Sequence, residues 1–373
     1  MKVLFCTNLP SPYRVDFFSE LGKLCDLTVC YERKSSSERD SKWTSKSTGT
    51  YTEEFLNLQP VGTDKSKGSA LRKYVKTHRF DLLIFTNYVS EACMEAIVYC
   101  KLHRIPYCIE YDGGFNKSDP LPKKLLKQFL LKNAKAHMTT CDIHIEYLKS
   151  LGIDRKNIYK YPFTSLRQSD LDYAQEKGKT GKKEYRQKLG MIESKIVISV
   201  GRFSYDKGYG KGYDIVMKLA EQMRDDIGFY IIGDEPTEEF RKIKENKQLT
   251  NVHFVGFKTK DELEKYYLAA DLFVLFSRGD IWGLVINEAM AHSLPIITTK
   301  ACLAGTELVK NGKNGYVVDL DDLNNIRQKL DYLLQNDDIR NQNADRSFEY
   351  IQKYTIEDMA ETHRLIFEDI YLK

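Results

Sequence analysis

The sequence lacks several patterns that would assign it to a common class at once. No apolar run approaches the roughly 18 residues of a transmembrane helix, and no internal repeat is present. A G-x4-G-K-[ST] phosphate loop is absent, and the first predicted strand leads into Pro10-Ser11-Pro12 where a dinucleotide-binding loop has G-x-G-x-x-G. These absences argue against a membrane-spanning protein, a P-loop nucleotidase and an NAD-dependent oxidoreductase.

The eight cysteines lack the spacing of a metal site. None forms C-x2-C, and they are scattered through apolar segments. Thiols so placed are typical of a reduced protein core. We therefore expect a cytoplasmic protein without a metal site or disulfides.

The 373 residues are enough for two domains, and their charge is uneven. Residues 1–193 carry 33 Lys and Arg against 23 Asp and Glu, whereas residues 194–373 carry 24 against 30. The basic first half indicates an anionic partner, such as nucleic acid, a membrane surface or a phosphorylated lipid. Because no nucleic-acid recognition motif accompanies the charge, we do not expect nucleic-acid binding.

The stretch Arg278 to Thr299 is the most informative part of the chain. The apolar run 272–276 before it is the length of a buried strand. After a polar turn, apolar residues recur at helical spacing until Pro295, and 296–299 reads as another strand. Such a strand–loop–helix–strand unit builds a parallel sheet, and open sheets of this kind bind ligands at the carboxyl ends of their strands.

Two acids occupy this unit with the spacing D-x7-E, Asp280 in the loop and Glu288 on the helix. A carboxylate can accept hydrogen bonds from the vicinal hydroxyls of a ribose or a hexose. Glu288 stands among apolar residues, and a partly buried acid needs a partner or a ligand. The alternative is a capping acid and a salt-bridged helix acid without a ligand.

A second loop also has the composition of an anion site. The strand 196–200 is followed by a glycine-rich loop that carries Arg202, Lys207 and Lys211 and then opens a helix. Amides at a helix N-terminus, with cations beside them, attract phosphate groups.

The first half contributes fewer candidates. Tyr13 and Arg14 follow a loop with two prolines after the first strand, and Asp112 begins a D-G-G turn after the strand 107–111. Asp112 is therefore expected at the carboxyl end of a strand, where it either takes part in catalysis or only shapes the turn.

Residues 121–136 form the clearest amphipathic pattern of the first half. Leucines recur at helical spacing and five lysines lie between them, with no acid. This predicts a basic helix that either lies on an anionic membrane surface or packs on the core with a solvated basic face.

Together these motifs resemble the retaining glycosyltransferases of family 4, which have the GT-B fold. Asp280 and Glu288 stand in the place of the family's E-x7-E signature, and GRFSYDKGYGKGYD resembles its G-R-x4-K-G-x-D loop. The resemblance is strong over residues 196–320 and weaker over the first half. Asp280 departs from the usual glutamate, which keeps the charge and shortens the reach.

The resemblance implies two facing Rossmann-like α/β/α domains with a cleft between them. Residues 1–165 would form the acceptor-side domain, 166–193 a charged linker and 194–353 the nucleotide-sugar-binding domain. The last helix, 354–373, would pack back on the first domain.

The resemblance also implies roles for the candidate residues. Glu288 would bind the ribose, Asp280 the sugar hydroxyls, and Arg202 with either lysine the donor diphosphate. The implied donor-site residues are Arg202, Lys207, Lys211, Gly283, Leu284, Val285 and Glu288. The implied catalytic residues are Asp280, Glu288, Arg202, Lys211 and Asp112. Tyr13 and Arg14 would contact the acceptor, since prolines replace the glycines that relatives often have there.

The implied reaction moves a sugar from a nucleotide-diphosphate donor such as a UDP-sugar, with retention and without a metal or cofactor. The acceptor would be a glycan or a lipid-diphosphate-linked glycan of bacterial capsule or exopolysaccharide synthesis, at the inner face of a membrane. The alternatives are a catalytically silent GT-B partner subunit and a dinucleotide-binding oxidoreductase.

Overall fold

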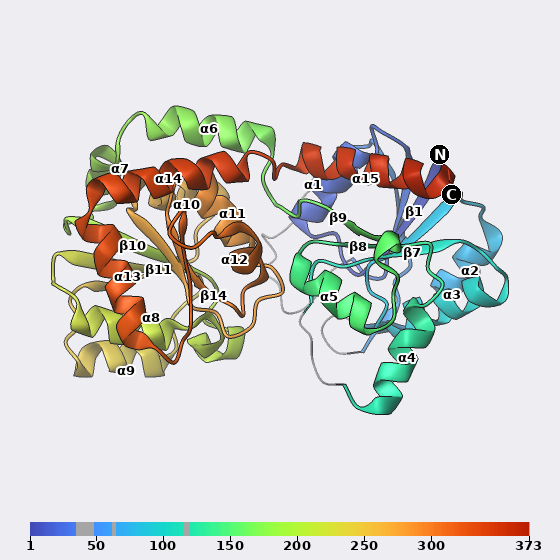
Figure 1. The fold of residues 1–373 in the computed structure, drawn as a ribbon, viewed down its shortest axis with the longest axis horizontal. Coiled ribbons are helices and arrows are strands. Elements are labelled where there is room, and N and C mark those ends of the chain that lie inside the picture. The colour runs from blue at the N-terminus through green and yellow to red at the C-terminus, as the bar shows by residue number, and fades with distance from the viewer. Residues whose placement is uncertain (35–47, 62–64, 115–118, 373) are drawn as a thin grey trace. The chain divides into compact units, whose positions relative to one another are not determined.

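The computed structural model describes residues 1–34, 48–61, 65–114 and 119–372. The chain forms two compact units: unit 1 comprises Met1–Thr164 with Tyr354–Lys373, and unit 2 comprises Ser165–Lys353. Each unit is a parallel sheet with helices on both faces (Figure 1). Two Rossmann-like α/β units are the fold class that the sequence predicts.

The sheet of unit 1 has the strand order β3-β2-β1-β6-β7-β8-β9, and all its pairs are parallel. Its strands are β1 (Lys2–Thr7), β2 (Asp26–Tyr31), β3 (Thr52–Phe55), β6 (Leu82–Phe85), β7 (Tyr107–Glu110), β8 (Ala136–Thr139) and β9 (Ile158–Lys160). A separate two-stranded ribbon joins β4 (Gln59–Pro60) to β5 (Ser66–Lys67). The helices are α1 (Pro12–Leu21), α2 (Ala70–Thr77), α3 (Glu91–Leu102), α4 (Leu121–Leu131), α5 (Asp142–Ser150), η1 (Arg155–Asn157) and α15 (Ile356–Leu372).

The sheet of unit 2 has the order β12-β11-β10-β13-β14-β15, again parallel throughout. Its strands are β10 (Lys195–Val200), β11 (Ile227–Ile232), β12 (Val252–Gly256), β13 (Leu272–Leu275), β14 (Ile296–Thr299) and β15 (Gly315–Val318). The helices are α6 (Gln168–Gly178), α7 (Lys182–Leu189), η2 (Tyr205–Lys211), α8 (Tyr213–Gln222), α9 (Glu238–Asn246), α10 (Lys260–Ala269), α11 (Leu284–Ala291), α12 (Leu303–Leu308), α13 (Leu323–Gln335) and α14 (Asp337–Ile351).

The predicted strand–loop–helix–strand unit is confirmed as β13, α11 and β14. Its strands are buried at every position because helices cover both faces of the sheet, which explains their unbroken apolar character. From β10 the strand order runs outward through β11 on one side and β13 on the other. The carboxyl ends of β10 and β13 therefore flank the point where the sheet changes direction, the usual ligand position in this fold class.

Residues 166–193, predicted as a charged linker, form α6 and α7, which belong to unit 2 and pack on α10 and α11. The cause is the buried Asp271, whose carboxylate accepts hydrogen bonds from Arg186 at 2.6 Å and from the Ile196 amide at 2.8 Å. Arg186, whose charge the sequence suggests is solvated, thus attaches α7 to the sheet.

The basic helix is also shorter than predicted. α4 ends at Leu131, because Lys132 is extended and Asn133 has a φ of 77°, and residue 136 already begins β8. Within the described parts of the chain, every helix falls short of the length and apolar character that crossing a membrane requires.

Asp271→Ala is expected to lower the free energy of unfolding by about 2–3 kcal/mol, because the Ile196 amide and Nη2 of Arg186 both lose the buried carboxylate that accepts from them. Lys188→Ala, which removes an exposed cation from the same helix, should change stability little. Urea unfolding of both variants would measure this; equal stabilities would show that Asp271 does not hold α7.

Candidate functional site

The candidate residues fall into two groups, one in each unit. In unit 2 they lie on the loops that follow β10 and β13, neighbouring strands whose carboxyl ends meet at one edge of the sheet. In unit 1 they lie near the ends of β1 and β7.

The loop after β10 turns sharply before it enters α8. Asp206, Lys207 and Gly208 all have positive φ, and Gly212 caps α8 with a φ of 74°. A Cβ on Gly212 would lie 2.1 Å from the Phe276 carbonyl oxygen, so only glycine fits there. This close approach packs the loop against the end of β13.

The ion pair between Lys211 and Asp280 joins the two loops. Lys211 Nζ lies 2.5 Å from Asp280 Oδ2, and both side chains are less than one-fifth exposed. The ammonium also stands 5.4 Å from the centre of the Tyr205 ring, whose hydroxyl donates to the Gly279 carbonyl at 2.8 Å. Two candidates that are 69 residues apart in the sequence are thus in direct contact.

A second ion pair holds the same loops in register. Arg278 donates to both carboxylate oxygens of Asp214 at 2.7 and 2.9 Å and to the Tyr209 carbonyl at 2.6 Å. Its backbone amide also donates to the Gly210 carbonyl at 2.9 Å. Nothing local in the sequence links Arg278 to Asp214, the last residue of the loop motif, so this contact was not predicted.

Arg202 and Lys207 lie on the same loop, and their side chains are exposed. Lys211, by contrast, is mostly buried and pairs with Asp280. The amides of Phe203 and Ser204, at the beginning of this loop, donate to the carboxylate of Asp234, which follows β11. They are therefore not available to an anion, whereas the expected amides at the start of α8 lie farther along the loop.

Glu288 is a partly buried residue of α11. Its two carboxylate oxygens accept hydrogen bonds from the Tyr267 hydroxyl at 3.0 Å and the Ser165 hydroxyl at 3.3 Å. Burial raises the pKa of Glu288, while these two donors and the nearby Lys260 act against the rise. A carboxylate has about four acceptor positions, so the two contacts leave room for sugar hydroxyls.

The start of α11 places Gly283, Leu284 and Val285 beside Asp280. Gly283 has a φ of 101°, and a Cβ there would lie 2.6 Å from Cys302 Sγ. The chain can therefore turn into the helix only with glycine at this position. The amides of Leu284 and Val285, in the first turn, have no acceptor within the helix and are suited to a polar ligand.

In unit 1, Arg14 is buried and its guanidinium contacts two carboxylates, Glu110 at the end of β7 and Asp112 two residues later. Its side chain is only 3% exposed, so it orients Asp112 and presents little surface to an acceptor. Tyr13 is half-buried, and its hydroxyl donates to Asp112 at 3.3 Å. Burial raises the pKa of Asp112, and the Arg14 guanidinium opposes that rise.

Glu110 and His363 were not among the predicted residues. Both are fully buried, and His363 Nε2 lies 2.9 Å from Glu110 Oε2. His363 Nδ1 donates to the Met359 carbonyl at 2.7 Å, within α15. α15 thereby closes over α1, with the rings of Phe17 and His363 4.7 Å apart, and adds a residue from the end of the chain to this group (Figure 1).

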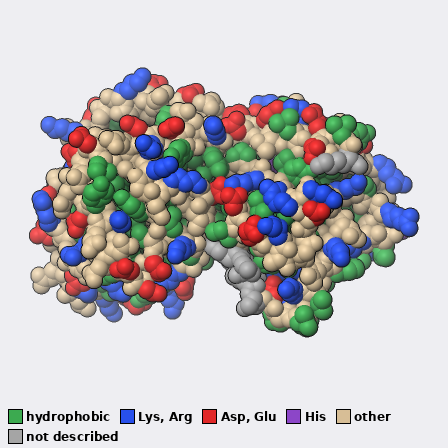
Figure 2. Space-filling view, in the orientation of Figure 1, with side chains coloured by type: hydrophobic (Ala, Val, Ile, Leu, Met, Phe, Trp, Pro, Cys, Tyr) green, Lys and Arg blue, Asp and Glu red, His purple; other side chains and the backbone are tan. Residues whose placement is uncertain are grey.

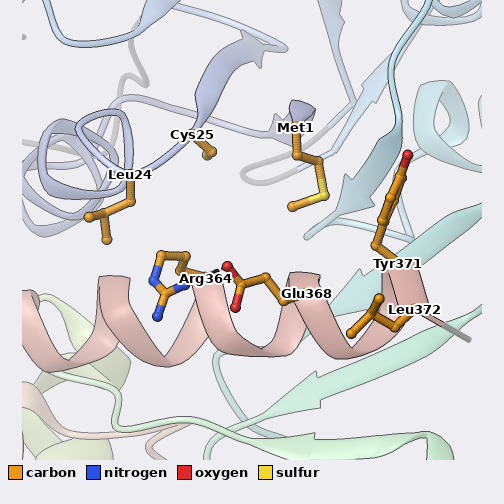
Figure 3. Close-up of a pocket in the computed structure, with 7 residues that line it drawn as sticks. All are labelled: Met1, Leu24, Cys25, Arg364, Glu368, Tyr371 and Leu372. Carbon is orange, nitrogen blue, oxygen red and sulfur yellow. Dashed lines mark hydrogen bonds and ion pairs between the residues drawn. The ribbon is translucent and has the colours of Figure 1, made fainter.

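A pocket of about 380 Å³ lies elsewhere in unit 1, between the start of β1 and the last turns of α15 (Figure 3). Its charged residues are Arg364 and Glu368, which pair with each other at 2.5 Å. None of the predicted site residues lines it, so it is not the candidate site.

Comparison with known proteins supports a transferase. Residues 181–349 match the family Glycosyl transferases group 1. An uncharacterized glycosyltransferase of Methanocaldococcus jannaschii is 25% identical over 187 residues, which are 48% of this chain and 52% of the relative. The lipopolysaccharide glucosyltransferase WaaG of Escherichia coli is 28% identical over 120 residues, 32% of each chain. The chain thus spans about half or less of the length of these relatives.

Solved structures extend the likeness to the whole fold. Anabaena HepE in complex with UDP is 16% identical, with a TM-score of 0.79 over 99% of this chain and 100% of the other. The structure of WaaG, a glycosyltransferase of lipopolysaccharide biosynthesis, is 15% identical, with a TM-score of 0.68 over 98% of this chain and 99% of the other. The GT-B fold class is therefore confirmed, and so is the resemblance to glycosyltransferases.

Glu110 gives the molecule a pH-dependent stability. Burial alone would raise its pKa, but Arg14 and His363 outweigh burial and lower the pKa from 4.5 to about 2. Since the folded pKa lies below the unfolded one, this contribution is complete above about pH 4.5 and is lost as the pH falls toward 2. Its size is about 3 kcal/mol.

We expect Glu110→Gln to unfold more easily at neutral pH and to show a flatter loss of stability between these two pH values. The raised pKa of Asp112 acts in the opposite direction, so the variant must be compared with the parent at each pH. Glu146→Gln, at an exposed acid on α5, is the control. Parallel stability curves for the parent and Glu110→Gln would contradict the assignment.

Proposed function

We propose that the chain is a retaining, metal-independent glycosyltransferase that moves a sugar from a nucleotide-diphosphate donor. UDP-sugars are the donors to test first. The observation that carries this proposal is the Lys211–Asp280 pair at the carboxyl ends of β10 and β13. It combines a cation for a diphosphate with an acid for sugar hydroxyls. The structures of HepE in complex with UDP and with UDP-glucose support the donor class.

In this proposal the donor lies on unit 2. Glu288 accepts hydrogen bonds from the ribose hydroxyls, and the amides of Leu284 and Val285 contact the donor beside Gly283. Asp280 contacts the hydroxyls of the transferred sugar. Arg202 and Lys211 stabilise the negative charge that grows on the diphosphate as the sugar leaves, the electrostatic contribution that is often the largest in catalysis. Lys207 is the alternative to Lys211.

The acceptor side of the proposal rests on unit 1. Asp112, with one-third of its side chain exposed and oriented by Arg14, is the acid available to an acceptor hydroxyl, and Tyr13 lies next to it. We propose a glycan or lipid-diphosphate-linked acceptor of bacterial surface polysaccharide synthesis, used at the cytoplasmic face of the membrane. Support comes from two relatives: WaaG, and a Klebsiella pneumoniae protein named for its place in a cps region, 30% identical over 135 residues.

A catalytically silent partner subunit is the second candidate, because Asp280 replaces the glutamate expected at its position. Incubating the protein with a panel of nucleotide sugars and following donor hydrolysis separates the two. Hydrolysis of one donor supports the enzyme. Calorimetric UDP binding without hydrolysis or transfer of any donor favours the silent subunit.

Glu288→Gln should weaken UDP binding by about 1.5–3 kcal/mol, because the amide offers fewer and weaker acceptors to the ribose. One of the two hydroxyls, of Tyr267 or Ser165, can still donate to the amide oxygen and the other can accept from the amide NH2, so the fold should survive. Calorimetry measures the change, with Glu245→Gln on the surface of α9 as the control. Asp280→Ala should instead lower turnover with UDP bound normally. Unchanged UDP affinity in Glu288→Gln would remove this residue from the ribose site.

Arg202→Ala should lower turnover about 10²–10³-fold and change donor binding less, since the charge it meets is greatest in the transition state. Lys211→Ala should cost more than Lys207→Ala, because only Lys211 is already held in the site by Asp280. Steady-state kinetics of the three variants decide the matter, with Lys218→Ala, at an exposed position of α8, as the control. The reverse order of the lysines would place the diphosphate at Lys207.

A further inference from the structure

The outer face of α4 is apolar and exposed. Leu121, Leu125, Leu126 and Phe129 follow one another at helical spacing and are 68%, 54%, 48% and 52% exposed. Hydrophobic side chains gather over the lower part of α4 in Figure 2. The predicted alternative of a helix packed by its leucines on the core therefore does not apply to these four residues.

The opposite side of α4 is firmly attached to unit 1, so the exposed face does not result from a loose helix. Leu130 and Leu131 are buried, and the Tyr107 hydroxyl donates to the Leu130 carbonyl at 2.9 Å. Lys101 donates to the carbonyls of Phe129 and Lys132, both at 2.7 Å, at the last turn. The helix therefore presents its apolar face in a fixed orientation.

The lysines around this face divide into two sets. Lys123 and Lys127 pair with Asp119, and Lys127 also donates to the Tyr147 hydroxyl at 2.9 Å, so these two hold the start of the helix. Lys124 and Lys132 are exposed and form no ion pair with any residue that the structure describes. Residues 120–135 contain five lysines and no acid.

We propose that α4 is the surface by which the protein lies on an anionic lipid bilayer. Three leucines and a phenylalanine would enter the boundary between headgroups and acyl chains, and Lys124 and Lys132 would meet the lipid phosphates. A helix with leucine and phenylalanine on one face and lysines beside it is suited to this position. The bilayer is favoured over a protein partner because its negative charge complements Lys124 and Lys132, near the two ends of α4, which are exposed beside the apolar face. The inference goes beyond the proposed reaction, since binding to lipid requires no sugar donor.

Vesicle sedimentation tests the proposal. The parent protein should bind vesicles of phosphatidylcholine and phosphatidylglycerol, and bind phosphatidylcholine alone more weakly. Raising the salt concentration should reduce only the part due to charge, because the Debye length shrinks to about 3 Å at 1 M. Absence of binding to both kinds of vesicle would overturn the proposal.

Leu125→Glu with Phe129→Glu should weaken vesicle binding about tenfold or more, because both side chains would otherwise be buried in the lipid. Leu365→Glu is the matched control: this leucine is 52% exposed on α15 of the same unit. Lys124→Gln with Lys132→Gln should weaken binding to the anionic vesicles alone. Substitutions at Lys127 are avoided, because that residue is part of the fold.

Two outcomes count against the proposal even if the variants fold normally, as circular dichroism and retained UDP binding would show. One is parent-like vesicle binding by the Leu125 and Phe129 variant. The other is a parent dimer that this variant dissociates while vesicle binding is unchanged, which would make the face an interface between two copies. Because UDP binding is measured separately, failure here is distinguishable from failure of the proposed reaction.

Discussion

The candidate donor site depends on the packing of two loops against each other at the carboxyl ends of β10 and β13. Neighbouring parallel strands bring their loops to the same edge of the sheet, but they do not by themselves fix the side chains. The bidentate contact of Arg278 with Asp214 sets the register of the loops, and Gly212 lets their backbones approach. Lys211 and Asp280 can meet only because these contacts exist.

In unit 1 the candidate residues are held together by a cluster of buried charges. Arg14 lies between Glu110 and Asp112, and His363 reaches Glu110 from α15. Buried ions are costly unless each is paired, so this cluster constrains α1, β7 and α15 together. The cluster also fixes the orientation of Asp112. Arg14 contacts one of its carboxylate oxygens, while part of the side chain stays accessible after the end of β7.

Local sequence was sufficient for most of the fold and for the chemistry of the loops. Short apolar runs that end in turns predicted β13 and β14, and helical spacing up to Pro295 predicted α11. These patterns succeed because a strand covered on both faces and a helix against a sheet each leave a periodic signal in neighbouring residues. Solvated charge leaves no such signal, so the sequence of residues 166–193 did not reveal that α6 and α7 pack on α10 and α11.

The sequence by itself determined the element types, the likeness to glycosyltransferases and the residues with suitable chemistry. Tertiary structure alone decided which of them meet: Lys211 with Asp280, Arg14 with two carboxylates, and His363 with Glu110 across 253 residues. It also turned Leu121, Leu125 and Leu126 of α4 outward, although the same pattern in the sequence fits a buried face. The physical reason is that spacing along the chain defines a face, whereas only packing of distant segments decides what that face contacts.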